Sequence, residues 1–396
     1  METAVKVALE KPAPVKESKP IPTPALLLTM LKAAAKVSDL IMSPGSYPVV
    51  EQSGKLVPIK IAGMAPLTAE DTRRIGYELI GGNKQAIEAL EQLGSCDVSY
   101  RVPGHSRFRV NIFQQRGTHA IVMRVIPPVI PTFDQLHLPP QLGEITNLLN
   151  GIVLVTGPTG SGKSSTLAAI IDRINDTHAY HILTIEDPIE FVHPCKKGHV
   201  NQREVGPHTQ SFANALRASL REAPDVIMIG EMRDLETISL AITAAETGHL
   251  VFGTLHTPDA QRTINRVIDV FPPREQGQIR AMFSESLRGI VSQHLLPGLD
   301  GKSMHLACEI LFNTGAIANI IRENRAFQIH GIMQTHRKQG MCLMDDSLLR
   351  LLREKKVSRE EVLARADNVG LMEKESAPPP AAVQPAPAQV VGGGHA

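Results

Sequence analysis

The residues with the clearest chemistry form one short run, Gly157-Pro158-Thr159-Gly160-Ser161-Gly162-Lys163-Ser164, which has the pattern G-x-x-x-x-G-K-[ST]. In this pattern the glycines let the backbone fold around an anion with its N–H groups pointing inward. Lys163 can then bridge the β- and γ-phosphates of a nucleotide, and the Ser164 hydroxyl can ligate Mg²⁺. The run predicts binding of ATP or GTP with Mg²⁺. The expected phosphate-binding residues are Gly157, Pro158, Thr159, Gly160, Ser161, Gly162, Lys163, Ser164 and Ser165.

The elements on either side of this run support that interpretation. Ile152–Val155 is an apolar stretch typical of a buried strand, and Ser164–Ile171 has a helical pattern. A strand, a glycine loop and a helix in this order form the phosphate-binding P-loop, and the helix N-terminus adds a positive dipole end. The alternative is a chance glycine-rich turn, which the two flanking elements argue against.

Acidic residues follow two further predicted strands. The strand His181–Ile185 leads into Glu186 and Glu190, and the strand Val226–Gly230 ends at Glu231, an arrangement typical of a Walker B segment. In a parallel sheet these carboxylates emerge at the edge where a P-loop holds its phosphates, so they could orient water or hold the Mg²⁺ shell. The alternatives are a solvated acidic turn for Glu186 and Glu190 and an ordinary acid at a strand end for Glu231.

Two histidines, His249 and His256, bracket another predicted strand, and they are too far apart to share a metal ion. His256 would lie at the phosphate edge of the sheet, where it could sense the γ-phosphate or be a structural histidine. Beyond Glu231, the residues Arg233 and Asp234 could pair across a subunit interface or cap the next helix.

Composition narrows the class of protein. The 396 residues carry a formal net charge of +1, so nucleic acid is not an expected partner. The four cysteines are scattered without a C-x-x-C pair, which favours a reducing compartment over a zinc site or disulfides. No apolar run approaches the roughly 20 residues of a membrane span. We expect a cytoplasmic protein without direct membrane insertion.

The chain divides into five predicted segments. The pattern predicts a disordered arm, an α+β domain, a proline-rich linker, a domain of alternating strands and helices, and a disordered tail. The expected ranges are 1–22, 25–126, 127–142, 143–366 and 376–396. From residue 151 to about 311 the alternation favours a parallel sheet covered on both faces, followed by helices. A helix over 25–37 is also expected.

Several motifs together resemble the secretion ATPases of type II secretion and type IV pilus systems. Thr184–Glu190, Gly230–Asp234 and Thr247–Thr257 resemble their Asp box, Walker B segment and His box, and 201–206 adds to the likeness. Within that superfamily the chain is most similar to the pilus retraction ATPase (PilT) family. Ala316–Glu323 resembles its A-I-R-N-L-I-R-E motif, but Ala318 stands where the family has arginine.

The resemblance, which covers roughly residues 25–366, implies a fold and a site. It implies an α/β fold with a RecA-like P-loop ATPase domain, a small N-terminal α+β (PAS-like) domain and a helical C-terminal part. It also implies homo-hexameric rings with nucleotide held between the two domains. Arg109 and Arg124 would then present guanidinium groups to the phosphates. The alternative is that both arginines are solvated strand residues.

The function implied is ATP hydrolysis that powers type IV pilus retraction, that is, pilin disassembly and twitching motility. The expected partner is the inner-membrane pilus platform protein, which would hold the ring at the inner face of the cytoplasmic membrane. Glu231 and Glu190 are the leading catalytic candidates, with Glu186, His256, Arg109 and Arg124 beside them. The alternatives are an accessory retraction paralogue, a pilus extension or type II secretion ATPase, and a nucleotide-gated signalling module.

Overall fold

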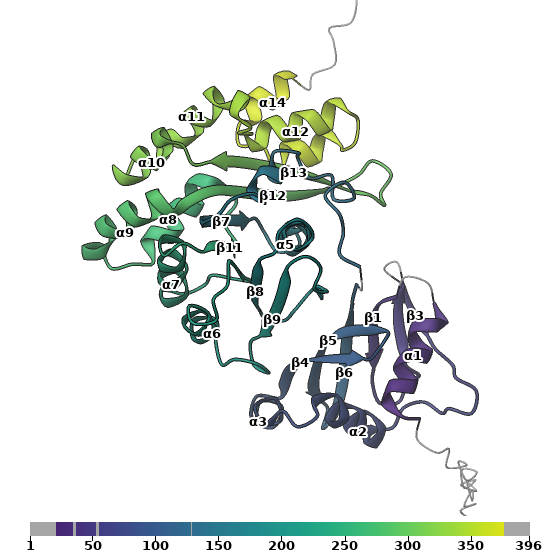
Figure 1. Cartoon of the computed structure of the whole chain (residues 1–396). Helices are drawn as coiled ribbons and strands as arrows, with labels where there is room; N and C mark the ends of the chain where they lie inside the picture. Colours follow the sequence, from purple (N-terminus) through teal and green to yellow (C-terminus); the bar gives the residue numbers. More distant parts are fainter. Residues whose placement is uncertain (1–20, 35–36, 53–54, 128, 376–396) are drawn as a thin grey trace, which may run out of the picture. The chain divides into compact units, whose positions relative to one another are not determined.

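The computed structural model describes residues 21–34, 37–52, 55–127 and 129–375 (Figure 1). The predicted tail, 376–396, and all but two residues of the predicted arm lie outside this part. Contacts group the chain into two compact units. The first contains residues up to Ile130 with Thr184–Cys195 and Val200–Ala215, and the second contains Pro131–Leu183, Lys196–His199 and the chain from Leu216 onward. The domain boundaries expected from the sequence remain predictions.

The first unit is built on a six-stranded sheet of order β3-β2-β1-β6-β5-β4, in which all neighbouring strands are antiparallel. Its elements are α1 (Thr23–Ala33), β1 (Val37–Met42), β2 (Val49–Gln52), β3 (Lys55–Pro58), α2 (Ala69–Ile80), α3 (Lys84–Leu93), β4 (Ser95–Val102), β5 (Ser106–Gln115) and β6 (Thr118–Ile126). β4 and β5 are antiparallel and are joined by a short turn, so they form a hairpin. The first helix is shorter than predicted, because Val37 already belongs to β1.

Alternation along β5 explains how this unit divides core from surface. Phe108, Val110 and Ile112 point into a core that they share with buried residues of α2 and α3. Arg107 and Arg109 lie on the opposite face, because successive side chains of a strand point to opposite sides. One face of the sheet is thus available for charged groups.

A second sheet has seven strands in the order β13-β12-β7-β11-β10-β8-β9. Its strands are β7 (Gly151–Thr156), β8 (His181–Glu186), β9 (His199–Glu204), β10 (Val226–Ile229), β11 (Leu250–Leu255), β12 (Leu287–Pro297) and β13 (Met304–Phe312). β10 runs parallel to β11, β11 to β7, and β7 to β12, but β13 runs antiparallel to β12. The prediction of a parallel sheet is therefore wrong at this edge.

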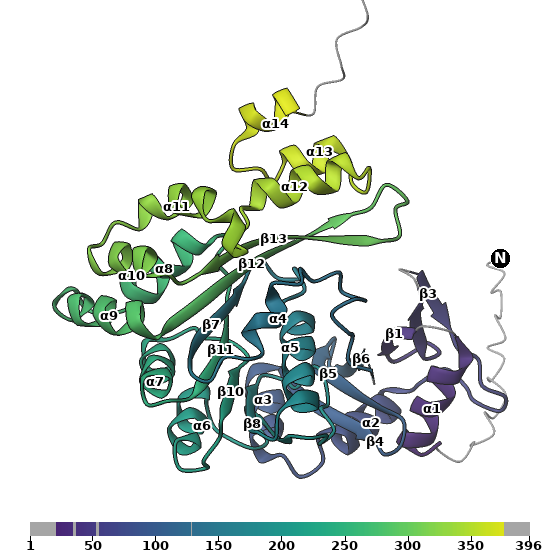
Figure 2. The same ribbon diagram turned by 45° about the horizontal axis from the view of Figure 1, so that its top comes forward.

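The helices of this region are α4 (Leu142–Ile145), α5 (Lys163–Thr177), α6 (Phe212–Ser219), α7 (Leu235–Glu246), α8 (Ala260–Asp269) and α9 (Pro273–Ser286). Figures 1 and 2 show α5 on one side of β7 and β11, and α7 and α9 on the other. The strands β7, β10 and β11 are buried along their whole length, which is why their sequences are continuously apolar.

The last part of the chain is helical, as predicted. It comprises α10 (Gly315–Arg322), η1 (Ala326–Gln328), α11 (Ile329–Thr335), η2 (Arg337–Gln339), α12 (Met344–Arg353), α13 (Arg359–Leu363) and α14 (Val369–Glu375). In the described residues, no helix combines the length and apolar character that crossing a membrane requires.

Candidate active site

The loop between β7 and α5 has the backbone that the glycine pattern predicts. Gly157, Gly160 and Gly162 all have positive φ, at 136°, 80° and 90°, where residues with side chains are strained. A Cβ on Gly157 would also lie 2.3 Å from the carbonyl oxygen of Gln293. The glycines at these positions are therefore required by conformation, and at Gly157 also by close approach to β12.

Polar groups line this loop. The Lys163 ammonium donates to the carbonyl oxygens of Gly157 at 2.8 Å and Pro158 at 2.9 Å. Ser161 Oγ is buried and has no hydrogen-bond partner among the described residues. Ser164 follows Lys163 in the first turn of α5 and is exposed. A cation, an unsatisfied hydroxyl and a helix N-terminus thus share one loop, which suits an anionic phosphate chain.

β12 forms side-chain hydrogen bonds with both elements that flank the P-loop. Thr156 Oγ1, at the end of β7, donates to Ser292 Oγ at 2.8 Å, and Gln293 Nε2 donates to Thr166 Oγ1 of α5 at 2.8 Å. Both bonds are buried and join segments more than a hundred residues apart. The strand and helix on either side of the P-loop are therefore fixed to one common strand.

Glu231 lies just beyond β10 and meets two partners. Its carboxylate contacts the Arg233 guanidinium, with the closest pair of atoms 2.5 Å apart, and His256 Nε2 lies 3.1 Å from its Oε1. Glu231 is 21 % exposed, so water can reach it. The predicted Walker B and His box residues therefore come together in the second unit.

The pKa of Glu231 lies below its ordinary value, because burial and the neighbouring positive charges act in opposite directions and the charges have the larger effect. Burial alone would raise this pKa, but the hydrogen bond and charge of Arg233 and the charges of His256 and Lys163 lower it further than burial raises it. The carboxylate therefore stays ionised at neutral pH, as a group that accepts a hydrogen bond from water must be.

Local packing keeps these strand ends in register. Thr254 Oγ1 donates to Gly230 O at 2.5 Å, and Met232 N donates to Thr254 O at 3.0 Å. Asp234 accepts from Thr237 N at 2.8 Å and caps α7, which is one of the two roles left open for it. A Cβ on Gly253 would lie 2.5 Å from Met232 Sδ, so the glycine lets this segment pack against β11.

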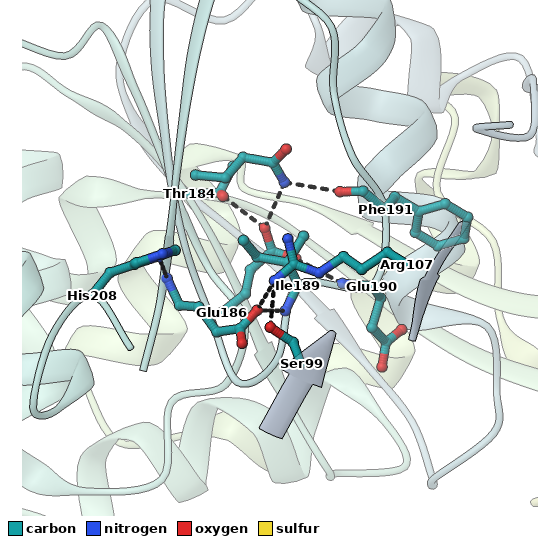
Figure 3. Close-up of polar contacts among 10 residues, drawn as sticks. Ser99, Arg107, Thr184, Glu186, Ile189, Glu190, Phe191 and His208 are labelled. Atoms are coloured by element: carbon teal, nitrogen blue, oxygen red, sulfur yellow. Dashed lines mark hydrogen bonds and ion pairs between the residues drawn. The ribbon is translucent and has the colours of Figure 1, made fainter. Parts of the chain in front are cut away.

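In the first unit, Glu186 is buried within a polar network (Figure 3). Its carboxylate accepts from Thr184 Oγ1 at 2.6 Å and Gln202 Nε2 at 3.0 Å. Burial raises the pKa of Glu186 to about 7, although these hydrogen bonds oppose the rise. Glu186 is thus a poorly accessible carboxyl whose protonation changes near neutral pH.

Glu190 has the opposite environment. It is exposed, and Figure 3 shows its carboxylate directed away from the network around Glu186. Of the two acids predicted in this turn, only Glu190 can present a carboxylate to a substrate or to water without prior rearrangement.

Arg109 and Arg124 are exposed and lie opposite one another on β5 and β6. Arg124 Nε also donates to Asp39 Oδ1 of β1 at 3.0 Å. The structure therefore brings the two predicted arginines together on one face of the six-stranded sheet. It adds a carboxylate, Asp39, that the sequence analysis did not single out.

The chain is similar to known proteins in both sequence and structure. The family model described as "Type II/IV secretion system protein" matches residues 95–374. The type IV pilus retraction ATPase PilT of Pseudomonas aeruginosa is 45% identical over 339 residues, which cover 86% of this chain and 97% of PilT. The chain belongs to the type IV pilus retraction ATPase family. Type IV pilus ATPase PilU of the same species is 38% identical, with 84% of this chain and 85% of PilU covered.

A crystal structure of the pilus retraction motor PilT with bound ADP superposes with a TM-score of 0.81 and 45% sequence identity, covering 88% of this chain and 99% of that chain. This likeness confirms the predicted α/β fold of the retraction ATPase family.

The helix that carries the family motif is α10. Thr314 caps it by accepting from Ile317 N at 3.4 Å, and Ile317, Ile320 and Ile321 form its buried side. Ala318 is partly exposed, and Arg322 is exposed, with its Nη1 3.9 Å from Glu285 Oε1 of α9. This member of the retraction ATPase family thus presents the polar side of α10 outward.

Three residues without a predicted role contact the turn of Glu190 or one another. They are Glu204 and Gln202 of β9, and Arg107 of β5, which forms an ion pair with Glu204. The sequence signal for Gln202 and Glu204 is the 201–206 segment, which indicates family likeness but no particular chemistry. Asp39 carried no signal of its own, because its role depends on strand pairing.

Proposed function

We propose that this chain is a Mg²⁺-dependent ATP hydrolase that powers type IV pilus retraction. The observation that carries the enzymatic half is the convergence of Lys163, Glu231 and His256. Glu231 lies 3.1 Å from His256, and the Lys163 charge helps to lower the Glu231 pKa. A phosphate-binding cation beside an ionised, solvent-accessible carboxylate suits hydrolysis better than binding alone.

The loop residues fit the phosphates of ATP and a magnesium ion. The close approach at Gly157, the unsatisfied Ser161 hydroxyl and the Lys163 ammonium form an anion cradle. The exposed Ser164 hydroxyl would hold Mg²⁺. When bound, the ion would neutralise charge on the phosphates and orient them. Lys163 would exchange its carbonyl partners for phosphate oxygens.

The remaining residues take proposed roles by their accessibility and charge. Glu231 is the first candidate to orient water, because it is ionised and has His256 as a neighbour. Glu190 is the second, because its carboxylate is exposed, whereas Glu186 is proposed to act through its buried network. Arg109 and Arg124 are proposed to neutralise phosphate charge, a role typically worth several kcal/mol in related hydrolases.

The mechanical half of the proposal rests on family membership. The 45% identical relative is named a type IV pilus retraction ATPase. We propose that this chain forms a homo-hexamer at the cytoplasmic face of the inner membrane and acts on the pilus platform protein. Nucleotide binding and product release would open and close each subunit in turn.

A second candidate is an accessory retraction ATPase. Ala318 favours it, because the exposed side of α10 lacks the first arginine of the family motif. The greater identity to PilT than to PilU favours the main retraction role. Twitching of a deletion strain separates the two, since loss of an accessory protein should leave partial motility.

Purified variants test the enzymatic half. Lys163→Ala should lose both nucleotide affinity and turnover, because the phosphates lose their cation. Glu231→Ala and Glu190→Ala should keep nucleotide binding and lose at least about tenfold in kcat, as expected for groups that act only in the transition state. Arg274→Ala, an exposed change on α9, is the control. Wild-type rates in all three variants would refute the assignment.

A further inference from the structure

Two side chains of β9 hold the backbone on both sides of Glu190. Gln202 and Glu204 are two residues apart, so they lie on the same face of the strand. Glu204 Oε2 accepts from Ile189 N at 3.1 Å. Gln202 Nε2 donates to Phe191 O at 2.8 Å, and Gln202 Oε1 accepts from His193 N at 2.9 Å. The residue before Glu190 and the residues after it are therefore each fixed to β9.

Glu204 requires a counter-charge, because its side chain is only 3 % exposed. Arg107 of β5 supplies it through an ion pair, and Arg107 Nη2 also donates to Ser99 Oγ at 3.0 Å (Figure 3). The Glu204 backbone N–H is engaged as well, since it donates to His208 Nδ1 at 2.9 Å. Removing one member of a buried ion pair leaves the other uncompensated, so the two residues act as a unit.

Glu186 also contacts both Gln202 and the turn that carries Glu190. Gln202 Nε2 also donates to Glu186 Oε1 at 3.0 Å, and Glu186 Oε2 accepts from Glu190 N at 3.4 Å. The exposed Glu190 carboxylate is therefore carried on a turn whose backbone has partners at positions 189, 190, 191 and 193. Such support matters for catalysis, because misplacement of a reacting group by about 1 Å can cost about 100-fold in rate.

We propose that Gln202, Glu204 and Arg107 form a brace that positions Glu190 for ATP hydrolysis. The proposal rests on the proposed function, in which Glu190 orients water or the metal shell. The three brace residues are positioning residues, since they act on the turn and not on the substrate. The brace also joins β5, the strand of Arg109, to the turn that carries Glu190.

The first test measures kcat and KM for ATP on full-length protein. Glu204→Ala and Gln202→Ala should each lower kcat about tenfold or more while KM changes less than about threefold, because the phosphate-binding loop is untouched. Glu204→Gln keeps an oxygen that can accept from Ile189 N. The double variant Glu204→Gln with Arg107→Met lacks both charges of the ion pair. It should therefore keep more activity than Glu204→Ala. Failure of that rescue would overturn the role of the pair.

Arg74→Ala is the matched control, since it breaks an exposed arginine–glutamate pair on α2 of the same unit. It should keep the wild-type kcat. Thermal unfolding of every variant checks folding. If Glu204→Ala does not fold, Gln202→Ala carries the test, because it leaves the ion pair of Arg107 with Glu204 intact.

A double-mutant cycle separates positioning from general stability. In a Glu190→Gln background, adding Glu204→Ala or Gln202→Ala should change the residual turnover less than about twofold, because a brace for Glu190 has nothing left to position. Radiolabelled ATP quantifies these slow rates. Full additivity would overturn the brace. If Glu190→Gln turns over ATP at the wild-type rate, the role proposed for Glu190 is overturned. If Glu190→Gln has a low turnover rate but Glu204→Ala and Gln202→Ala keep the wild-type rate, only the brace is overturned.

Discussion

At the scale of single residues, the charge of Glu231 depends on its neighbours. Burial favours the neutral acid, whereas Arg233, His256 and Lys163 favour the carboxylate, and the net effect is a lowered pKa. Lys163 is nearly fully buried, but Arg233 is 73 % exposed and His256 44 % exposed. The state of this carboxylate therefore responds to substitutions at the surface.

Arg233→Ala should make turnover more sensitive to acid. Arg233 is the largest of the influences that lower the pKa of Glu231, so removing the guanidinium raises this pKa and the carboxylate is protonated at a higher pH. Because Arg233 is largely exposed and screened by solvent, we expect the acid limb of the kcat profile to move up by about one pH unit at most.

The measurement is the ratio of variant to wild-type kcat from about pH 8 down to pH 4.5, the ordinary pKa of a glutamate side chain. The ratio should fall toward the acid end, since the variant loses the charged form of Glu231 first. Arg274→Ala, with a side chain 85 % exposed on α9, serves as the control and should give a constant ratio. A constant ratio for Arg233→Ala would mean that Glu231 does not need its charge for turnover.

The sequence could predict a site residue when its contacts lie nearby along the chain, and could not when they lie far apart. Lys163 and the P-loop glycines were predictable because their geometry is set within eight residues, and Glu231 because it ends a strand. The ion pair of Arg107 with Glu204 joins residues 97 apart, and that of Arg124 with Asp39 joins residues 85 apart. Such pairs depend on strand register and tertiary packing, which no local pattern contains.

At the scale of elements, one side of helix α10 packs against neighbouring helices through apolar side chains, and the other side is polar. Ile317, Ile320 and Ile321 are buried, and the helix packs against α9. Arg322 ends its polar side with a 3.9 Å ion pair to Glu285, whose side chain is 72 % exposed. Exposed pairs of this kind typically contribute about 0–1 kcal/mol, so Arg322 is not explained by stability.

Arg322→Ala should therefore leave ATP binding and most of the ATPase rate in place and abolish twitching. The physical reason is that α10 carries no phosphate-binding group, so its polar side is available to transmit motion. Stability should change by no more than about 0.5 kcal/mol, because the side chain is exposed. The assays are complementation of a deletion strain and the ATPase rate of the purified variant.

Ala318→Arg is the complementary change, since it restores the family residue on the same helix. It should raise retraction if Ala318 has weakened this protein. Normal twitching with Arg322→Ala would leave α10 as ordinary packing and would remove a principal reason to favour retraction over other ring ATPases.

The elements themselves were predictable where their pattern was simple. The fully buried strands β7, β10 and β11 and the helices after β13 followed from apolar runs and helical periodicity. The direction of β13 did not, because its mostly apolar and mostly buried sequence is compatible with a strand that runs either parallel or antiparallel to β12. A short connection, Gly298–Ser303, was the available signal, since it is too short for a parallel crossover.

At the scale of the whole molecule, the candidate groups fall in two units. The P-loop, Glu231 and His256 belong to the second unit, whereas Glu190, Arg109 and Arg124 belong to the first. The roles proposed for these groups require that both units contribute to turnover. In the ring that we propose, neighbouring copies can couple those contributions.

We therefore predict that the active form is a homo-hexamer with coupled sites. Mass photometry with Mg-ATP should give a species of six times the 43.0 kDa of one chain. Mixing wild-type subunits with Lys163→Ala subunits should lower the rate per wild-type subunit, because a copy that cannot bind nucleotide interrupts closure around the ring. A linear fall in activity with the fraction of variant would mean independent sites. A monomer with full activity would contradict the ring itself and, with it, the proposal that sequential closure of subunits moves the pilus machinery.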